Sequence, residues 1–194
     1  REGEEVMWLD ILQALKDAPL DHQDHIHAVH WLVVPRHPQR FDEVAALMAE
    51  RGWHVSRRSQ WTDGPNADQP DDGNTIWLGD SLGEMALYYG LSDAALLGGS
   101  FAPLGGQNLI EAAACGCPVI MGPNTFNFAQ ASEMAEQNGA ALRVSDMAQG
   151  VAQATALLHD APQLQRRALQ AQRFAQAHQG AAQRTAQAVV QLLR

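Results

Sequence analysis

The sequence predicts an α/β fold in which a parallel β-sheet carries helices on both faces. Short apolar runs without clear alternation recur along the chain, as in strands that are buried on both faces. Segments with helical spacing of apolar residues separate these runs. Glycine-bearing turns stand between several of the runs and the helices that follow them, where α/β folds usually bind ligands.

The expected strands and helices alternate along the chain. The strands are expected at residues 27–35, 53–56, 75–78, 94–97, 118–121 and 140–144. The helices are expected at residues 6–15, 41–52, 85–89, 107–116, 128–138 and 145–159. Helical spacing is clearest in the second helix, where Phe41, Val44, Ala45 and Met48 occupy positions i, i+3, i+4 and i+7 before Gly52. The first helix has an acidic first turn, which suits the positive end of its dipole.

Turn and capping residues define the remaining boundaries. Loop 57–74 is polar and carries glycine and proline turn signals, so we assign no chemistry to it. Gly139 follows a helix that it can end, and Ser145 can cap the next one. From Pro162 onward the sequence is rich in Ala and Gln, which are good helix formers, and we expect two helices there. A doubly wound domain would need one more strand directly before Arg1.

Length and composition restrict the class of protein. The chain has 194 residues, which suits one domain with a sizeable core or one half of a two-domain enzyme. Its 46% hydrophobic and 18% charged residues indicate a globular protein. The net charge of −9 argues against a nucleic acid partner, because no basic stripe offsets it. No apolar run is long enough to cross a bilayer, and the lack of a disulfide framework favours a reducing compartment.

Two groups of residues could suggest a metal, and neither has the pattern of a metal site. Cys115 and Cys117 flank Gly116 at a helix end and supply only two ligands, so we interpret them as small buried residues. Four histidines cluster around the first strand, but their spacing matches no known metal site. They are His22, His25, His27 and His30.

Residues 97–123 are the stretch richest in functional signals. They read as the end of a buried strand, a glycine-rich loop, a short helix and the next strand. The Gly98-Gly99 pair allows a sharp turn after the strand, and Gly105-Gly106 stand just ahead of a helix that is expected to begin near Gln107. Free N–H groups at a helix N-terminus favour an anion. The stretch therefore predicts a pocket for a phosphorylated sugar or a nucleotide.

Asn108 and Glu111 lie three residues apart and would share one face in the first turn of that helix. A carboxylate is a poor phosphate ligand but a good acceptor for sugar hydroxyls. The alternative is purely structural: such turns also occur for packing reasons, Asn108 can cap the helix, and Glu111 can be a solvated helix residue.

Two other strands are followed by polar loops. Arg36 and His37 follow the strand at 27–35, flanked by prolines that fix the turn, and Arg36 offers a planar fork for a phosphate or carboxylate. Residues 79–85 place a glycine-bearing turn between a strand and a helix, and Asp80 and Ser81 there could be simple helix caps. Arg36 could equally be an ordinary loop residue.

These loops also carry a family resemblance. The motifs are Pro35-Arg36-His37-Pro38 with Arg40-Phe41, Gly79-Asp80-Ser81-Leu82-Gly83-Glu84, Gly98-Gly99-Ser100, Pro103, Gly105-Gly106-Gln107-Asn108-Leu109-Ile110-Glu111, and Gly122-Pro123 with Phe126-Asn127-Phe128. Together they resemble the C-terminal half of the 3-deoxy-D-manno-octulosonic acid (Kdo) transferases, which add Kdo to the lipid A precursor. Gln107 departs from the usual His, and Leu82 from the usual Met. Arg57-Arg58-Ser59 recurs in the family as well.

The resemblance implies a Rossmann-like domain that forms the C-terminal, donor-binding half of a GT-B glycosyltransferase. It implies CMP-Kdo as donor, a lipid A precursor as acceptor, and inversion at the anomeric carbon without a metal or a cofactor. The residues that it places at the donor are Arg36, His37, Gly79, Leu82, Gly83, Glu84, Gly99, Ser100, Gly105, Gly106, Gln107, Asn108 and Glu111. The general base is expected in the N-terminal half, so no catalytic residue is assigned to this chain.

The resemblance also implies how the chain is organised. Residues 1–194 would be a single donor-binding domain without its N-terminal acceptor domain. In the family a strand leads into a turn like Arg1-Glu2-Gly3-Glu4, so the chain is expected to begin just after that strand. Family members attach to the cytoplasmic face of the bacterial inner membrane through their N-terminal half. This fragment is therefore expected to be soluble and, without the acceptor side, inactive by itself.

Other nucleotide-binding classes fit less well. A dehydrogenase domain needs G-x-G-x-x-G at its first turn, and the chain has neither this motif nor a Walker A loop. The Asp-x-Asp motif, which binds metal and diphosphate in the other large glycosyltransferase fold, is also absent. A non-catalytic nucleotide or nucleotide-sugar binding module remains an alternative, as does a GT-B domain for another nucleotide sugar.

Overall fold

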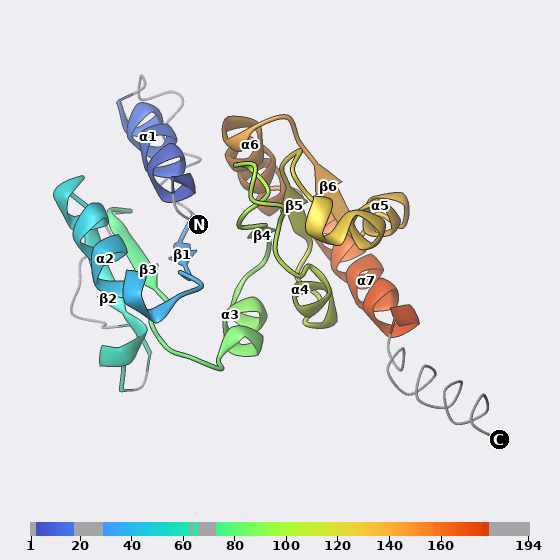
Figure 1. Ribbon diagram of the computed structural model, residues 1–194, viewed down its shortest axis with the longest axis horizontal. Coiled ribbons are helices and arrows are strands. Elements are labelled where there is room, and N and C mark those ends of the chain that lie inside the picture. Colours follow the sequence, from blue (N-terminus) through green and yellow to red (C-terminus); the bar gives the residue numbers. More distant parts are fainter. Residues whose placement is uncertain (1–2, 18–28, 63, 66–72, 179–194) are drawn as a thin grey trace.

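The computed structural model describes residues 3–17, 29–62, 64–65 and 73–178. Its strands form two three-stranded parallel sheets (Figure 1). The first has the order β1-β3-β2 and consists of β1 (Trp31–Val33), β2 (His54–Arg57) and β3 (Thr75–Leu78). The second has the order β4-β5-β6 and consists of β4 (Ala95–Leu96), β5 (Val119–Met121) and β6 (Ala141–Arg143).

Helices surround both sheets and confirm the predicted fold class. They are α1 (Glu4–Lys16), α2 (Phe41–Glu50), α3 (Met85–Leu91), α4 (Ile110–Ala114), α5 (Ala129–Gln137), α6 (Met147–Leu158) and α7 (Ala161–His178). Three short 3-10 turns complete the described elements: η2 (Pro38–Arg40), η3 (Arg58–Gln60) and η4 (Phe126–Phe128). Of the two helices expected after Pro162, the structure shows one, α7, and the remaining tail lies outside the described residues.

The core is divided into two main clusters. Buried residues of α1, α2 and α6 pack together with Ile76 and Leu78 of β3. Buried residues of α4, α5 and α7 pack together with Val119 and Met121 of β5. Each cluster is built from helix faces with apolar residues at helical spacing, which lose contact with water when they cover a strand.

Two predicted helix starts are wrong. The helix expected near Gln107 begins at Ile110, whose N–H donates to the Oδ1 atom of Asn108 at 3.1 Å, so a side chain and not a helical carbonyl accepts this hydrogen bond. The cap of α6 is Asp146 and not Ser145: the Asp146 carboxylate accepts a hydrogen bond from the Gln149 N–H at 2.8 Å.

A single sheet was predicted, whereas the described strands form two. Leu32 of β1 pairs with Trp77 of β3, and Leu96 of β4 pairs with Ile120 of β5, but β1 and β4 do not pair with each other. Among the described residues, no helix is both long and apolar enough to cross a membrane.

Candidate functional site

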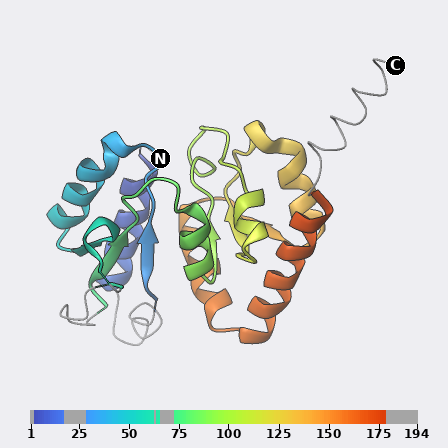
Figure 2. The same ribbon diagram turned by 90° about the horizontal axis from the view of Figure 1, so that it is seen from below.

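The loops that hold the predicted site residues follow β1, β3, β4 and β5. In Figure 2 the first three of these loops lie on the same side of the molecule, at the carboxyl ends of their strands. Ligands of open parallel sheets bind outside this edge. The candidate site is therefore built from residues 34–37, 79–84, 97–109 and 122–128.

Ser100 joins the loops after β4 and β5 from the inside. The side chain is fully buried. Its hydroxyl donates to the Leu97 carbonyl at 2.6 Å and accepts from the Gly122 N–H at 2.8 Å. A Cβ at Gly122 would lie 2.4 Å from the Ser100 carbonyl oxygen, so only glycine fits there. Ser100 therefore holds the loop in shape, and we assign it no direct ligand contact.

The buried carboxylate of Glu4 occupies main-chain donors of the loop after β4. It accepts hydrogen bonds from the N–H groups of Gly99 at 2.6 Å, Phe101 at 2.9 Å and Ala102 at 3.0 Å. Glu4 lies 95 residues before Gly99 in the chain, so no local sequence pattern links the two. These amides fix the loop against α1 and are not free for a donor phosphate.

The segment that ends in α4 presents Asn108 and Glu111. Asn108 precedes the N-cap Leu109, and its Oδ1 atom accepts a hydrogen bond at 3.1 Å from the N–H of Ile110, the first residue of α4. The amide group of Asn108 donates to the Glu111 carboxylate at 3.2 Å, and Glu111 is exposed. Because α4 has only 5 residues, its dipole contributes little, and this segment offers mainly its polar side chains.

The glycines before α4 shape the segment. Gly99, Gly105 and Gly106 all have positive φ angles, as does Gly83 in the loop after β3. The Gly105 carbonyl accepts from the Asn127 N–H at 3.0 Å, which joins this loop to the one after β5. The side chain of Asn127 also donates to the Leu104 carbonyl at 3.0 Å.

The loop after β3 is held by two arginines that we call the arginine clamp, Arg57 and Arg58. Arg57 Nε donates to the Asp80 carboxylate at 2.7 Å, and the Asp80 side chain is only 1% exposed. Arg58 pairs with Glu84 at 2.8 Å. The clamp gives Arg57 and Arg58 a structural role that no local sequence pattern indicates.

Ser59 completes the anchoring of Asp80 and corrects one sequence-based alternative. Its N–H and its hydroxyl donate to the two carboxylate oxygens of Asp80 at 2.8 and 2.7 Å. Asp80 therefore binds η3 and does not cap α3. Ser81 is hydrogen-bonded to Glu84 and to Tyr88.

These contacts lower the pKa values of two carboxyl groups, those of Asp80 and Glu84. Burial by itself would raise the pKa of Asp80, but hydrogen bonds from Ser59 and Arg57 outweigh it and hold this pKa below its ordinary value. The Ser81 hydroxyl and the Arg58 guanidinium lower the pKa of Glu84. Both carboxylates are thus ionised at neutral pH and form ion pairs with the arginine clamp.

The remaining residues of this loop differ in exposure. Gly79 is buried, and a Cβ there would lie 2.8 Å from the Tyr88 ring and 2.9 Å from Val34. Leu82 is 70% exposed, and Gly83 is exposed beside it. The tip of the loop is therefore accessible, whereas its base is packed.

Arg36 and His37 lie at the end of β1 and are both exposed. Among the described residues Arg36 has no hydrogen-bond or ion-pair partner, so its guanidinium is available to an anion. Arg40, by contrast, pairs with Glu5 at 2.8 Å and with Glu43 at 3.3 Å. The structure gives no contact between Arg36 and the other predicted site residues.

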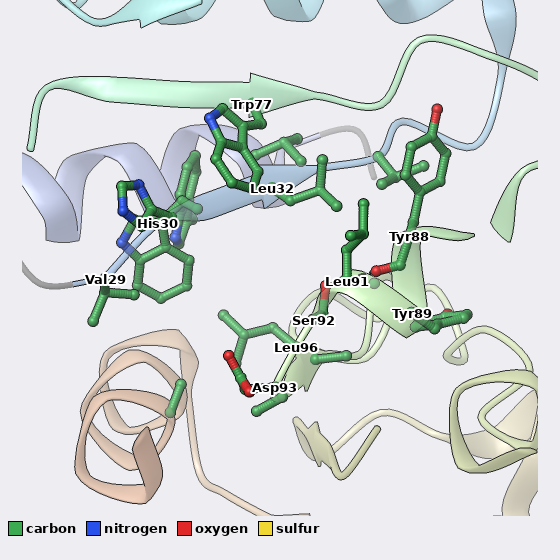
Figure 3. Close-up of a pocket in the computed structure, with 18 of the residues that line it drawn as sticks. Val29, His30, Leu32, Trp77, Tyr88, Tyr89, Leu91, Ser92, Asp93 and Leu96 are labelled. Atoms are coloured by element: carbon green, nitrogen blue, oxygen red, sulfur yellow. Dashed lines mark hydrogen bonds between the residues drawn. The ribbon is translucent and has the colours of Figure 1, made fainter. Parts of the chain in front are cut away.

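A cavity of about 610 Å³ extends from this edge between β1 and β4 (Figure 3). At the edge it reaches Glu4, Gly98 and Gln107, and its walls are mostly apolar and aromatic. A Cβ at Gly98 would lie 3.2 Å from the amide nitrogen of Gln107, so the Gln107 side chain packs over this turn.

Metal-binding side chains do not gather in the part of the chain that the structure describes: no three or more of His, Cys, Asp and Glu are clustered there. Of the histidines singled out above, His22, His25 and His27 lie outside the described residues. Burial raises the pKa of Cys117 to about 12, so this thiol stays protonated.

The chain is similar to proteins that share one name. It is 44% identical over 191 residues to the 3-deoxy-D-manno-octulosonic acid transferase of Bordetella pertussis, an alignment that covers 97% of this chain and 42% of the relative. It is 39% identical over 127 residues to the enzyme of the same name from Haemophilus influenzae, which covers 66% of this chain and 28% of that relative. The sequence matches no protein-family model.

A solved structure shares the fold. The crystal structure of the C-terminal CMP-Kdo binding domain of WaaA from Acinetobacter baumannii superimposes with a TM-score of 0.71 and 31% sequence identity. The superposition covers 87% of this chain and 83% of that domain. The chain therefore spans less than half of the full-length relative from Bordetella pertussis, and it belongs to the 3-deoxy-D-manno-octulosonic acid transferase family.

Proposed function

We propose that this domain binds CMP-Kdo and that the full-length protein transfers Kdo from it to a lipid A precursor. The observation that carries the proposal is the likeness, over 87% of the chain, to a domain described as CMP-Kdo binding. In this proposal the domain is the C-terminal half of a GT-B glycosyltransferase, and residues 1–194 act as one donor-binding unit.

The donor carries two anions, the phosphate of CMP and the carboxylate of Kdo. Arg36 is the exposed cation at the carboxyl end of β1, and a planar guanidinium suits either anion. We assign Arg36 to this charge, with the neighbouring His37 beside it. The exposed carboxylate of Glu111 and the amide of Asn108 suit the hydroxyls of the ribose.

The loop after β3 would border the base and the ribose. Its tip, Leu82 and Gly83, is accessible, while the arginine clamp fixes its base through Asp80 and Glu84. A loop that is fixed before the ligand arrives loses less conformational entropy on binding. Gly79, Gly105 and Gly106 shape this surface, and Gln107 lies at the rim of the cavity.

The proposed transfer is an inverting single displacement without a metal or a cofactor. The acceptor hydroxyl oxygen forms a bond to the anomeric carbon of Kdo while the bond from that carbon to the CMP phosphate oxygen breaks. Arg36 stabilises the charge that develops on the departing phosphate, and a general base takes the proton of the acceptor hydroxyl. We expect this base in the N-terminal half, together with the acceptor groove and the contact with the inner membrane.

Calorimetric titration of the full-length protein with CMP, UMP, ADP and NAD tests the donor assignment. We expect CMP to bind more tightly than the other three nucleotides. Tighter binding of UMP or ADP would indicate another nucleotide sugar, and equal or stronger binding of NAD would contradict the proposed site.

A further inference from the structure

Phe126 presents an aromatic ring to solvent at the edge of the candidate site. It lies in η4, within the loop after β5, and it is 63% exposed. A Cβ at Gly105 would lie 2.6 Å from the Phe126 ring and would also collide with the Asn127 amide nitrogen. Both side chains therefore pack on the main chain of Gly105, in the glycine turn that leads to α4.

Hydrogen bonds hold the main chain on both sides of Phe126. Before it, Thr125 is buried, and its hydroxyl accepts from Arg143 Nη1 at 3.1 Å. After it, the Asn127 N–H donates to the Gly105 carbonyl at 3.0 Å. Single exposed apolar side chains are common on protein surfaces. This one differs because its backbone is fixed at the site, so its ring loses less conformational entropy when a ligand covers it.

Asn127 adds a hydrogen-bond acceptor next to the ring. Its amide nitrogen donates to the Leu104 carbonyl at 3.0 Å, which orients the side chain. Asn127 is exposed, and among the described residues no group donates to its Oδ1 atom. An exposed ring beside such an acceptor suits a sugar, because the ring can cover a C–H face while the amide oxygen accepts from a hydroxyl.

The position of this loop favours the Kdo ring over the nucleotide. The proposed function gives the base to the loop after β3, the ribose to Asn108 and Glu111, and the phosphate or the Kdo carboxylate to Arg36. It gives the loop after β5 no part of the donor. Figure 1 shows β5 farther from β3 than β1 and β4 are, so this loop lies at the end of the site opposite the base. The part of the donor that still lacks contacts is the Kdo ring itself.

We propose that the Phe126 ring packs against the C–H face of the Kdo ring of the donor, and that the Asn127 amide oxygen accepts a hydrogen bond from a Kdo hydroxyl. This contact depends on the proposed function, which supplies CMP-Kdo as the donor. Kdo is a 3-deoxy sugar, so its carbon 3 carries only hydrogen and enlarges the apolar face that an aromatic ring can cover. The contact removes from water a ring that the domain alone leaves exposed. Phe126 thus recognises the sugar and not the nucleotide.

Steady-state kinetics of the full-length protein test the contact. Phe126→Ala should raise the KM for CMP-Kdo by about five- to twentyfold, with little change in kcat, because the contact is made to bound substrate and transition state alike. The KM for the lipid A precursor should stay unchanged. Leu169→Ala is the matched control, since Leu169 is 49% exposed on α7, outside the candidate site, and should alter neither KM. An unchanged KM for CMP-Kdo in Phe126→Ala, or a rise in the acceptor KM alone, would overturn the proposal.

Two further variants separate a flat ring from apolar bulk. Phe126→Tyr keeps the ring and should keep the KM for CMP-Kdo within about twofold of that of the unmodified protein. Phe126→Leu keeps an apolar side chain without the flat face and should raise this KM toward the value of Phe126→Ala. A Phe126→Leu variant with the KM of the unmodified protein would refute packing of the ring on the sugar.

Calorimetric titration with CMP separates this proposal from the proposed function. CMP has no Kdo ring, so the unmodified full-length protein and Phe126→Ala should bind it with the same affinity. Weaker CMP binding by Phe126→Ala would put the ring on the nucleotide and overturn the contact with Kdo, while the CMP site itself would stand. A full-length protein that bound no CMP would contradict the proposed function, and the contact with Kdo with it.

Discussion

The polar side chains of the site fall into two groups, exposed ones at the loop tips that can contact a ligand and buried ones that hold the loops in place. Arg36 and Glu111 are exposed and can meet a ligand. Ser100 and Glu4 are buried and form their hydrogen bonds within the protein. Substitutions in the first group should change affinity, and those in the second should change stability.

Arg36→Ala tests the first group. The loss of a charge-assisted contact to phosphate should weaken CMP binding by about 1.5–3 kcal/mol, measured by calorimetry on the full-length protein. Arg51→Ala is the control, because Arg51 pairs with Asp10 of α1 and lies outside the candidate site. If Arg36→Ala folds normally and binds CMP with unchanged affinity, the assignment of the loop after β1 is wrong.

Glu111→Gln should weaken CMP binding less than Arg36→Ala does. Gln keeps the shape and can still accept a hydrogen bond, but it does so without charge, and hydrogen bonds to charged groups are about 1 kcal/mol stronger than neutral ones. Comparing the variant on CMP and on 2′-deoxy-CMP checks the role: its effect should be smaller on the deoxy compound. An equal loss on both would argue against a contact with this ribose hydroxyl.

Ser100→Ala tests the second group. The variant leaves the buried Gly122 N–H without its acceptor, so we expect it to lower the free energy of unfolding by about 1–3 kcal/mol. Urea unfolding measures this loss, while CMP affinity of the folded protein should change little. A large loss of affinity with unchanged stability would return Ser100 to the set of ligand contacts.

At the scale of elements, the arginine clamp joins β2 and η3 to the loop after β3. The loop also depends on the rest of the chain for its position, because its two carboxylates are held by residues more than 20 positions earlier. Arg57 also pairs with the exposed Asp42 of α2 at 2.7 Å. One short segment therefore connects a strand, a helix and a ligand loop.

Arg57→Ala should destabilise the protein more than Arg51→Ala. Removing Arg57 leaves the buried Asp80 carboxylate without its cation, which should cost about 1–3 kcal/mol because Arg57 itself is partly exposed. Arg51→Ala breaks a more exposed pair and should cost about 0–1 kcal/mol. Urea unfolding of both variants compares them, and equal losses would show that Asp80 gains nothing from Arg57.

The clamp also predicts a pH dependence. The pKa of Asp80 is lower in the folded protein than its ordinary value of 3.8, so its ionised form stabilises the fold above that pH. This contribution is lost as the pH falls below 3.8 through the lowered folded-state pKa, because the folded protein must then take up a proton that it binds poorly. Asp80→Asn should flatten this acid limb in urea unfolding measured between neutral pH and pH 3. An unchanged limb would place the acid sensitivity elsewhere.

At the scale of the whole molecule, the proposed function gives this domain the donor alone, and the proposed reaction also needs an acceptor and a base. In the proposed division of labour these come from the N-terminal half. The carboxylates placed near the ligand, Glu84 and Glu111, are a clamp partner and a ribose ligand. His37 lies next to Arg36, which is assigned to the charge of the donor.

Residues 1–194 alone should therefore transfer no Kdo. Incubating the purified domain with CMP-Kdo and a lipid A precursor is expected to give no product above background, whereas the full-length protein should turn over. Adding the separately purified N-terminal half is the informative control, because partial recovery would show that the two halves can assemble. Turnover by the domain alone would place the general base within these residues.

The sequence by itself determined the fold class, the parallel order of strand and helix, and the positions of the loops that follow the strands. These follow from local patterns: buried strands are continuously apolar, helices repeat every three to four residues, and ligand loops follow the strands. The start of α4 was misplaced because Asn108 can lie within a helix or just before it, and its hydrogen bond from the Ile110 N–H is not visible in the sequence. Only the tertiary structure could show that the Glu4 carboxylate accepts hydrogen bonds from main-chain N–H groups of the loop after β4. The same holds for the ion pairs of Arg57 with Asp80 and of Arg58 with Glu84. These contacts join residues far apart in the chain, so no local propensity encodes them, and they form only when the packed sheets bring buried charges together with partners that offset their desolvation.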